Sequence, residues 1–136
     1  MTGSKYQELA MRTNDRKNFE RIIKAMTNNL IDSCDAFCKG QGAKDLGGIL
    51  NACLGLSGEV GEFNDMVKKW IFHEKELDTE HAKKELGDIL WYAAMMCESF
   101  GWDMDEIMQM NVDKLKARYP EGFDVNLANN RKEGDV

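Results

Sequence analysis

Proline and histidine are scarce in this sequence of 136 residues, and long hydrophobic runs are missing. It contains one proline, two histidines and four cysteines, with no Cys-x-x-Cys pair. Few helix-breaking residues favour helices, and so few cysteines and histidines favour reduced thiols over a zinc site. No stretch reaches the roughly 18 to 20 apolar residues of a membrane span, and residues 1–10 lack the apolar segment of a signal peptide. We therefore predict a cytoplasmic protein with no membrane partner.

Basic charge is also in short supply. Lysine and arginine number 18 against 24 aspartate and glutamate residues, which gives a formal net charge of -6 and a pI of about 5.0. This balance predicts no binding to polymeric nucleic acid. It leaves room for a small phosphorylated molecule that is bridged by metal ions. A chain of this length forms one domain and can bury about two-thirds of its unfolded surface, so we expect it to fold without covalent or metal staples.

Helical periodicity predicts an all-α protein. The expected helices cover about residues 4–12, the segment from 15 to a glycine-containing break at 39–42, and then 49–70, 80–99 and 103–119. Asp78 or Thr79 is the expected N-cap of the helix at 80–99, and Asp103 with Glu106 forms an expected capping box. Gly101 is an expected helix stop, and Pro120 ends the last helix. We assign residues 1–123 to one helical domain with a motif-bearing core at 46–123, followed by a polar tail at 124–136.

Two of these helices carry a regular apolar stripe in steps of four and three residues. One consists of Ile49, Cys53, Leu56, Val60, Phe63, Val67 and Trp70, and the other of Leu86, Leu90, Ala93, Cys97 and Phe100. We expect the stripes to be the buried faces of two antiparallel neighbours. Gly55, Gly58 and Gly61 each weaken the first helix by about 1 kcal/mol relative to alanine. They indicate a close backbone approach or room for a bound group.

Two carboxylate pairs stand beside these stripes. Glu59 with Glu62, and Glu85 with Asp88, are spaced three apart, so each pair shares a helix face about 100° from the apolar stripe. In an antiparallel pair they can converge, where their mutual repulsion favours a divalent cation. Oxygen ligands favour Mg²⁺, with Mn²⁺ as a substitute. Solvated acidic faces are the open alternative, and a di-iron bundle would want two Glu-x-x-His motifs that the sequence lacks.

Cationic, amide and aromatic side chains lie close to the carboxylates in the predicted helices. They are Lys68, Lys69, Trp70, Tyr92, Asn111, Lys114 and Arg118. Asn111, Lys114 and Arg118 share one face of the fifth predicted helix. A nucleotide needs metal ions and cations for its phosphates and an aromatic face for its base, and all three are present. Each residue taken singly is equally typical of an ordinary surface or core position.

Three motifs then occur in a specific order. They are Glu59-Val-Gly-Glu62, Glu85-Leu-Gly-Asp88 and Lys114-Leu-Lys-Ala-Arg118-Tyr-Pro. From about residue 50 to 123 the sequence resembles the MazG-type all-α nucleoside triphosphate pyrophosphohydrolases, a superfamily that includes dimeric dUTPases and dCTP pyrophosphatases. The resemblance implies a four-helix-bundle-like fold with an extra N-terminal helix, assembled as a homodimer or homotetramer. Many relatives have glycine where this chain has Glu74.

The resemblance also implies an activity. A nucleoside triphosphate would be hydrolysed with Mg²⁺ between its α and β phosphates, giving a monophosphate and pyrophosphate. All four carboxylates would bind the metal ions, and Glu59 or Glu62 would also orient or deprotonate the attacking water. A non-catalytic nucleotide sensor or protein-interaction module on the same scaffold is the alternative. The presence of all four carboxylates favours catalysis.

The resemblance further implies which residues hold the substrate. Lys114 and Arg118, with Asn111, would contact phosphate or sugar, and Lys69 is a weaker candidate for the same role. Tyr92 and Trp70 are our candidates for stacking on the base.

Overall fold

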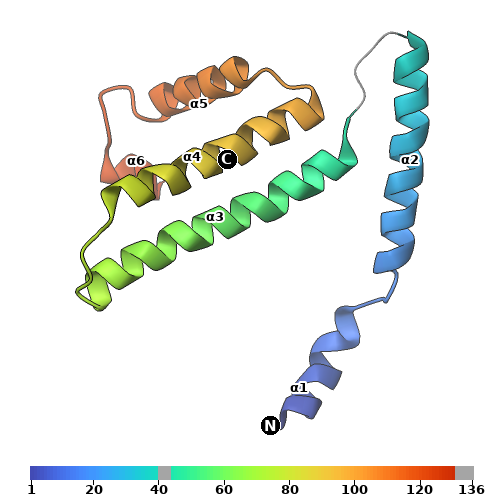
Figure 1. Cartoon of the computed structure of the whole chain (residues 1–136), viewed down its shortest axis with the longest axis horizontal. Coiled ribbons are helices and arrows are strands. Elements are labelled where there is room, and N and C mark those ends of the chain that lie inside the picture. Colours follow the sequence, from blue (N-terminus) through green and yellow to red (C-terminus); the bar gives the residue numbers. More distant parts are fainter. Residues whose placement is uncertain (40–43, 131–136) are drawn as a thin grey trace.

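The computed structural model describes residues 1–39 and 44–130, and these residues form helices and connecting turns with no strand (Figure 1). The helices are α1 (Gly3–Ala10), the 3-10 helix η1 (Met11–Thr13), α2 (Asn18–Lys39), α3 (Leu46–Phe72), α4 (Thr79–Phe100), α5 (Met104–Arg118) and α6 (Val125–Asn129). The all-α prediction is confirmed. Within the described part of the chain, no helix is both long and apolar enough to cross a membrane.

The predicted helix ends are confirmed where the capping residues can be followed. Asp78 caps α4 by accepting a hydrogen bond from the backbone N–H of His81 at 2.9 Å, and Asp103 caps α5 by accepting one from the backbone N–H of Asp105 at 2.8 Å. Gly101 ends α4 with a left-handed φ of 69°. Most of the break predicted at 39–42 lies outside the described residues. The short helix α6, capped by Asp124, begins within the segment that the sequence marks only as a polar tail.

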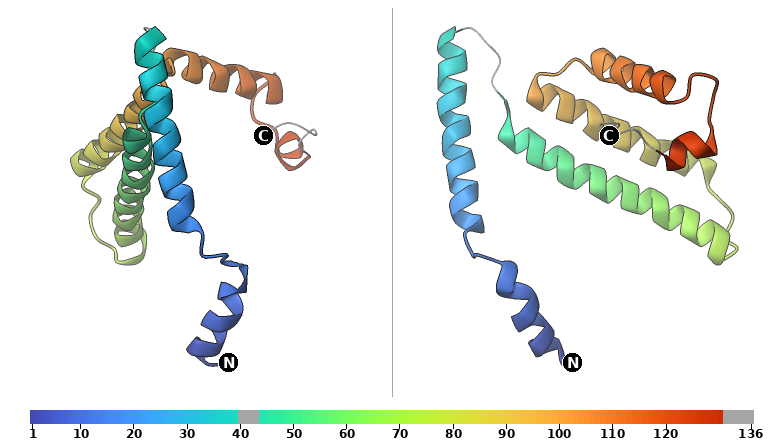
Figure 2. Two further views of the ribbon diagram at one scale, coloured as in Figure 1. Left: turned by 90° about the vertical axis from the view of Figure 1, so that its right-hand side faces the viewer. Right: turned by 180° about the vertical axis from the view of Figure 1, so that it is seen from behind.

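The α3–α4 pair is the extensive helix–helix contact of the structure, and the two helices run antiparallel side by side (Figures 1 and 2). A loop of six residues, 73–78, joins them. Glu74 in this loop has a φ of 52°, the left-handed region that favours glycine.

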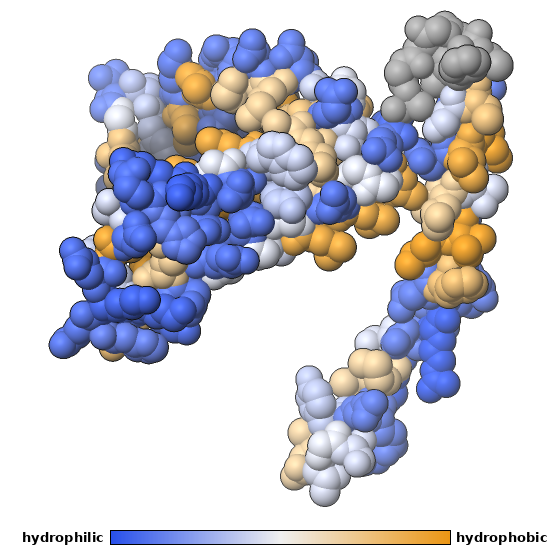
Figure 3. Space-filling model, in the orientation of Figure 1, coloured by the Kyte–Doolittle hydropathy of each residue, from blue (hydrophilic) through white to orange (hydrophobic). Residues whose placement is uncertain are grey.

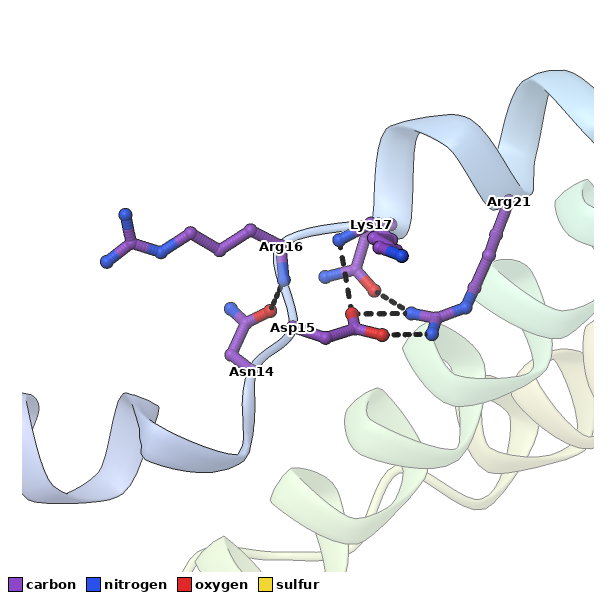
Figure 4. A network of polar contacts seen from close by, with 6 residues as sticks. Asn14, Asp15, Arg16, Lys17 and Arg21 are labelled. Atoms are coloured by element: carbon purple, nitrogen blue, oxygen red, sulfur yellow. Dashed lines mark hydrogen bonds and ion pairs between the residues drawn. The ribbon is translucent and has the colours of Figure 1, made fainter.

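The start of α2 is held by an ion pair between Asp15 and Arg21 (Figure 4). The guanidinium donates to both carboxylate oxygens, and the backbone N–H of Lys17 donates to one of them at 3.1 Å. The bonds from Arg21, and then from Lys17, lower the pKa of Asp15 below its usual 3.8. Both side chains are well exposed, so the pair orients the helix start while adding little to stability.

The faces that α3 and α4 turn toward each other coincide only in part with the predicted apolar stripes. Cys97 of the α4 stripe is buried, and the stripe residues Leu56, Phe63, Val67, Ala93 and Phe100 are half-buried. Val60 and Leu86 are 43% and 50% exposed, whereas Glu85 is only 6% exposed and Ala52 is fully buried. The contact therefore extends from the stripes to the adjacent faces that carry Ala52 and the carboxylates, which corrects the predicted geometry.

Small residues explain the choice of face. The Tyr92 ring packs so closely on Gly55 that a Cβ added there would lie 2.1 Å from the ring. At Gly48, an added Cβ would lie 2.2 Å from the buried Ser99 hydroxyl. The predicted close approach is thus confirmed at Gly55, where the approaching group is the Tyr92 side chain. The Tyr92 ring and the Ser99 hydroxyl occupy the space that Gly55 and Gly48 leave open, so leucine or valine could not replace these glycines without a clash.

The isolated chain leaves much apolar surface exposed. Its accessible surface is 11426 Å², against about 7,200 Å² expected for a compact protein of this mass. It therefore buries only about half of its unfolded surface, and the two-thirds expected from chain length is not reached. Figure 3 shows apolar residues along α2, where Phe19 is 74% and Leu30 67% exposed. In the isolated chain this face of α2 is largely exposed to solvent.

We expect Gly55→Ala to lower the free energy of unfolding by about 1–3 kcal/mol, the range typical of overpacked sites, because the Tyr92 ring must move. Gly58→Ala on the same helix is the matched control. Nothing lies within 4 Å of an added Cβ there, so helix propensity should raise stability by up to about 1 kcal/mol. Urea unfolding at one protein concentration measures both, and equal stabilities would contradict the close contact.

Candidate metal centre

Three carboxylates from α3 and α4 meet in the contact between these helices. Glu59, Glu85 and Asp88 each place one carboxylate oxygen within 4.8 Å of the other two. Glu85 is buried, Glu59 is half-buried and Asp88 is exposed, so the cluster opens to solvent at Asp88. Oxygens bind Mg²⁺ at about 2.0–2.1 Å and Ca²⁺ at about 2.3–2.6 Å, so this spacing can accommodate one divalent cation between them.

The two oxygens of Glu85 differ in their surroundings. Oε1 lies 2.7 Å from Nε2 of His81, in an ion-pair contact. Oε2 is buried and has no hydrogen-bond partner among the described residues. A buried carboxylate oxygen without a partner is costly, and a cation shared with the neighbouring carboxylates would satisfy it.

The negative charge of the cluster affects the pKa of Glu59. Desolvation in the helix contact, followed by the charges of Glu62, Asp88 and Glu85, raises the pKa of Glu59 above its usual 4.5. The folded chain therefore holds this proton more tightly than the unfolded chain does. In the absence of metal, the resulting stability is complete below pH 4.5 and is lost as the pH rises through the raised pKa.

Glu62 lies outside this three-residue group and lines an adjoining hollow of about 320 Å³. The hollow is lined by Gly58, Gly61, Glu62, Asp65, Met66, Lys69, His81 and Glu85, all from α3 and α4. An added Cβ would meet nothing within 4 Å at Gly58 or Gly61. These two glycines therefore provide the open space that the sequence allowed for, whereas Gly55 provides the close contact.

Asp65, which lines the hollow, forms ion pairs with two lysines. Its carboxylate accepts hydrogen bonds from Nζ of Lys68 at 2.8 Å and from Nζ of Lys69 at 2.5 Å. These bonds lower the pKa of Asp65 to about 2. Sequence reasoning missed Asp65 and the His81–Glu85 contact. The signal for both was their i,i+3 or i,i+4 spacing to oppositely charged or hydrogen-bonding partners.

The other candidate substrate residues lie in different places. Tyr92 is half-buried on Gly55, and its ring makes an edge-to-face contact with Trp91 at 4.8 Å. Trp70 is 49% exposed near the C-terminal end of α3. Asn111, Lys114 and Arg118 belong to α5, which contributes no residue to the lining of the hollow and diverges from the α3–α4 pair (Figure 2). Within one chain, Lys69 is thus the candidate cation that lies beside the carboxylates.

Comparison with known proteins bears on this arrangement. The family model of the MazG nucleotide pyrophosphohydrolase domain matches residues 49–123, which contain both carboxylate pairs and the whole hollow. The chain belongs to the MazG family. Gene 37 protein of Mycobacterium phage L5 is 30% identical over 88 residues, which cover 62% of this chain and 77% of that protein. No solved structure matches. The MazG match begins in α3, so α1 and α2 lie outside it.

We expect Glu59→Gln to raise the Tm of the metal-free protein at pH 7, because it removes one of the repelling charges in the helix contact. Differential scanning calorimetry in a chelating buffer measures this change, with Glu76→Gln in the exposed loop as the control. Saturating Mg²⁺ should raise the Tm of the unsubstituted chain more than that of the variant, because a ligand bound to the folded state stabilises it. A lower Tm for Glu59→Gln without metal would contradict the repulsion.

Proposed function

We propose that this MazG protein is a Mg²⁺-dependent nucleoside triphosphate pyrophosphohydrolase that cleaves between the α and β phosphates. The observation that carries the proposal is the cluster of Glu59, Asp88 and the buried Glu85, whose Oε2 has no hydrogen-bond partner among the described residues. Membership of the nucleotide pyrophosphohydrolase family supports the substrate class. All-oxygen ligands support Mg²⁺, with Mn²⁺ as its substitute.

The side chains divide the work by position. Glu59, Glu85 and Asp88 hold the metal, and Glu62 completes the set from the neighbouring turn. Bound Mg²⁺ neutralises phosphate charge and lowers the pKa of its water. Glu62 faces the hollow rather than the three-residue group, so we assign it the orientation and deprotonation of the attacking water. Glu59 is the second candidate for that role.

Substrate contacts follow from the same geometry. Lys69, held by Asp65 at the hollow, is placed to contact phosphate. We propose Asn111, Lys114 and Arg118 as contacts to phosphate or sugar, on the spacing that puts them on one face of α5. Trp70 and Tyr92 remain our candidates for the base, and the exposed indole of Trp70 is the more accessible of the two.

A homodimer or homotetramer completes the fold in this proposal. The chain exposes roughly 4,200 Å² more surface than a compact protein of its mass, and permanent interfaces bury about 2,000–5,000 Å². The apolar face of α2 and the exposed residues of the α3 and α4 stripes would supply that contact. Residues 1–123 would then act as one domain with its motif-bearing core at 46–123, followed by the tail at 124–136.

We also propose a reducing, cytoplasmic compartment, which the free thiols of Cys34, Cys53 and Cys97 support. The side chain of Cys38 lies outside the described residues.

The test is product analysis with each NTP and dNTP in Mg²⁺. We expect pyrophosphate as the first product, and a loss of turnover of about 10²–10⁴-fold in Glu62→Gln, the range for removal of a general base. Asp88→Asn should also abolish turnover, because it removes a metal ligand. Glu80→Gln, an exposed acid on the first turn of α4, is the control and should retain activity.

Two results would overturn the proposal. Orthophosphate as the first product would contradict cleavage between the α and β phosphates. Nucleotide binding without turnover of any nucleotide would favour a non-catalytic sensor on the same scaffold.

A further inference from the structure

His81 lies beside the metal centre without belonging to the group of potential ligands. Its Nε2 lies 2.7 Å from Oε1 of Glu85 in an ion-pair contact, and its imidazole lines the hollow. Oε1 is thus occupied, whereas Oε2 is buried and has no partner among the described residues. The Glu85 side chain is 8% exposed, so water has little access to it. One carboxylate therefore has one oxygen fixed by a neighbour and one left for a ligand.

The backbone of His81 is held in place. Asp78 accepts a hydrogen bond from the backbone N–H of His81 at 2.9 Å, which fixes His81 in the first turn of α4. Glu85 follows one turn later on the same face. The contacts therefore run from the helix cap to His81, and from His81 to Glu85. Glu85 contributes one of its two oxygens to the cluster with Glu59 and Asp88.

We infer that His81 is a positioning residue for the metal centre, which holds Oε1 of Glu85 so that Oε2 is presented to the cation. The inference rests on the proposed function, because it requires the carboxylate cluster to bind a metal. The terminal torsion of a glutamate is broad, so an unheld carboxylate can turn either oxygen, or neither, toward the ion. Removing a residue that hydrogen-bonds to a metal ligand commonly weakens metal binding by about 10–100-fold.

If His81 and Glu85 formed only an ordinary surface pair at i,i+4, a different effect on metal affinity would be expected. The His81 side chain is 54% exposed, and an exposed pair of this kind affects helix stability slightly. It would leave the affinity for a cation unchanged. Metal affinity, measured without any turnover, therefore separates a positioning role from a merely structural one.

The experiment titrates Mn²⁺ into the full-length protein at one fixed pH and follows free Mn²⁺ by electron paramagnetic resonance. We expect His81→Ala to weaken Mn²⁺ binding by about 10–100-fold. His81→Gln should retain most of the affinity, because its amide nitrogen can donate from nearly the same position as Nε2. Lys83→Ala is the matched control on the same turn of α4, where Lys83 pairs with the exposed Glu80, and it should bind as the unsubstituted chain does.

Three results would overturn the inference. If His81→Ala binds Mn²⁺ normally while Glu85→Gln does not bind it, the metal centre stands and His81 does not position it. If His81→Gln binds as weakly as His81→Ala, the contact with Oε1 is not the cause. If the unsubstituted chain does not bind Mn²⁺, the proposed metal centre and the role of His81 both fall.

Discussion

The packing of α4 side chains on small residues of α3 is the constraint on which the rest of the structure depends. The Tyr92 ring lies on Gly55 and the Ser99 hydroxyl beside Gly48, and Ala52 between these glycines is fully buried. Because the small residues of α3 share a helix face with Glu59, the packing that brings the helices together also brings carboxylates into their contact. The same geometry therefore positions the candidate ligands and sets their charges against one another.

That arrangement leaves two unfavourable features in the isolated, metal-free chain. The raised pKa of Glu59 shows that the ionised cluster works against the metal-free helix pair. The exposed residues of the apolar stripes, together with α2, leave the chain with far more surface than a compact protein of its mass. In the proposed function, a cation would offset the repulsion among the carboxylates and a second copy of the chain would cover the apolar surface, which would couple binding to folding.

Much of the fold could be predicted from local patterns. Helical periodicity, the Asp78 and Asp103 caps and the Gly101 stop predicted the helices correctly, because these depend on neighbours in sequence. The orientation of each helix about its axis could not be predicted this way. An apolar stripe indicates that a face will be covered, but not whether the covering element lies in the same chain. The predicted core residues Val60 and Leu86 accordingly proved exposed, and Ala52 proved buried.

The same limit applies to the candidate site. The spacing of Glu59, Glu85 and Asp88 indicated their convergence, whereas the roles of Asp65 and His81 depend on rotamers that spacing does not determine. The most direct test of the metal centre is an anomalous difference map from crystals grown with Mn²⁺. We predict a peak about 2 Å from Oε2 of Glu85, between Glu59 and Asp88. A map with no peak there, or with Mn²⁺ bound only elsewhere on the surface, would contradict the assignment of this cluster as the metal centre.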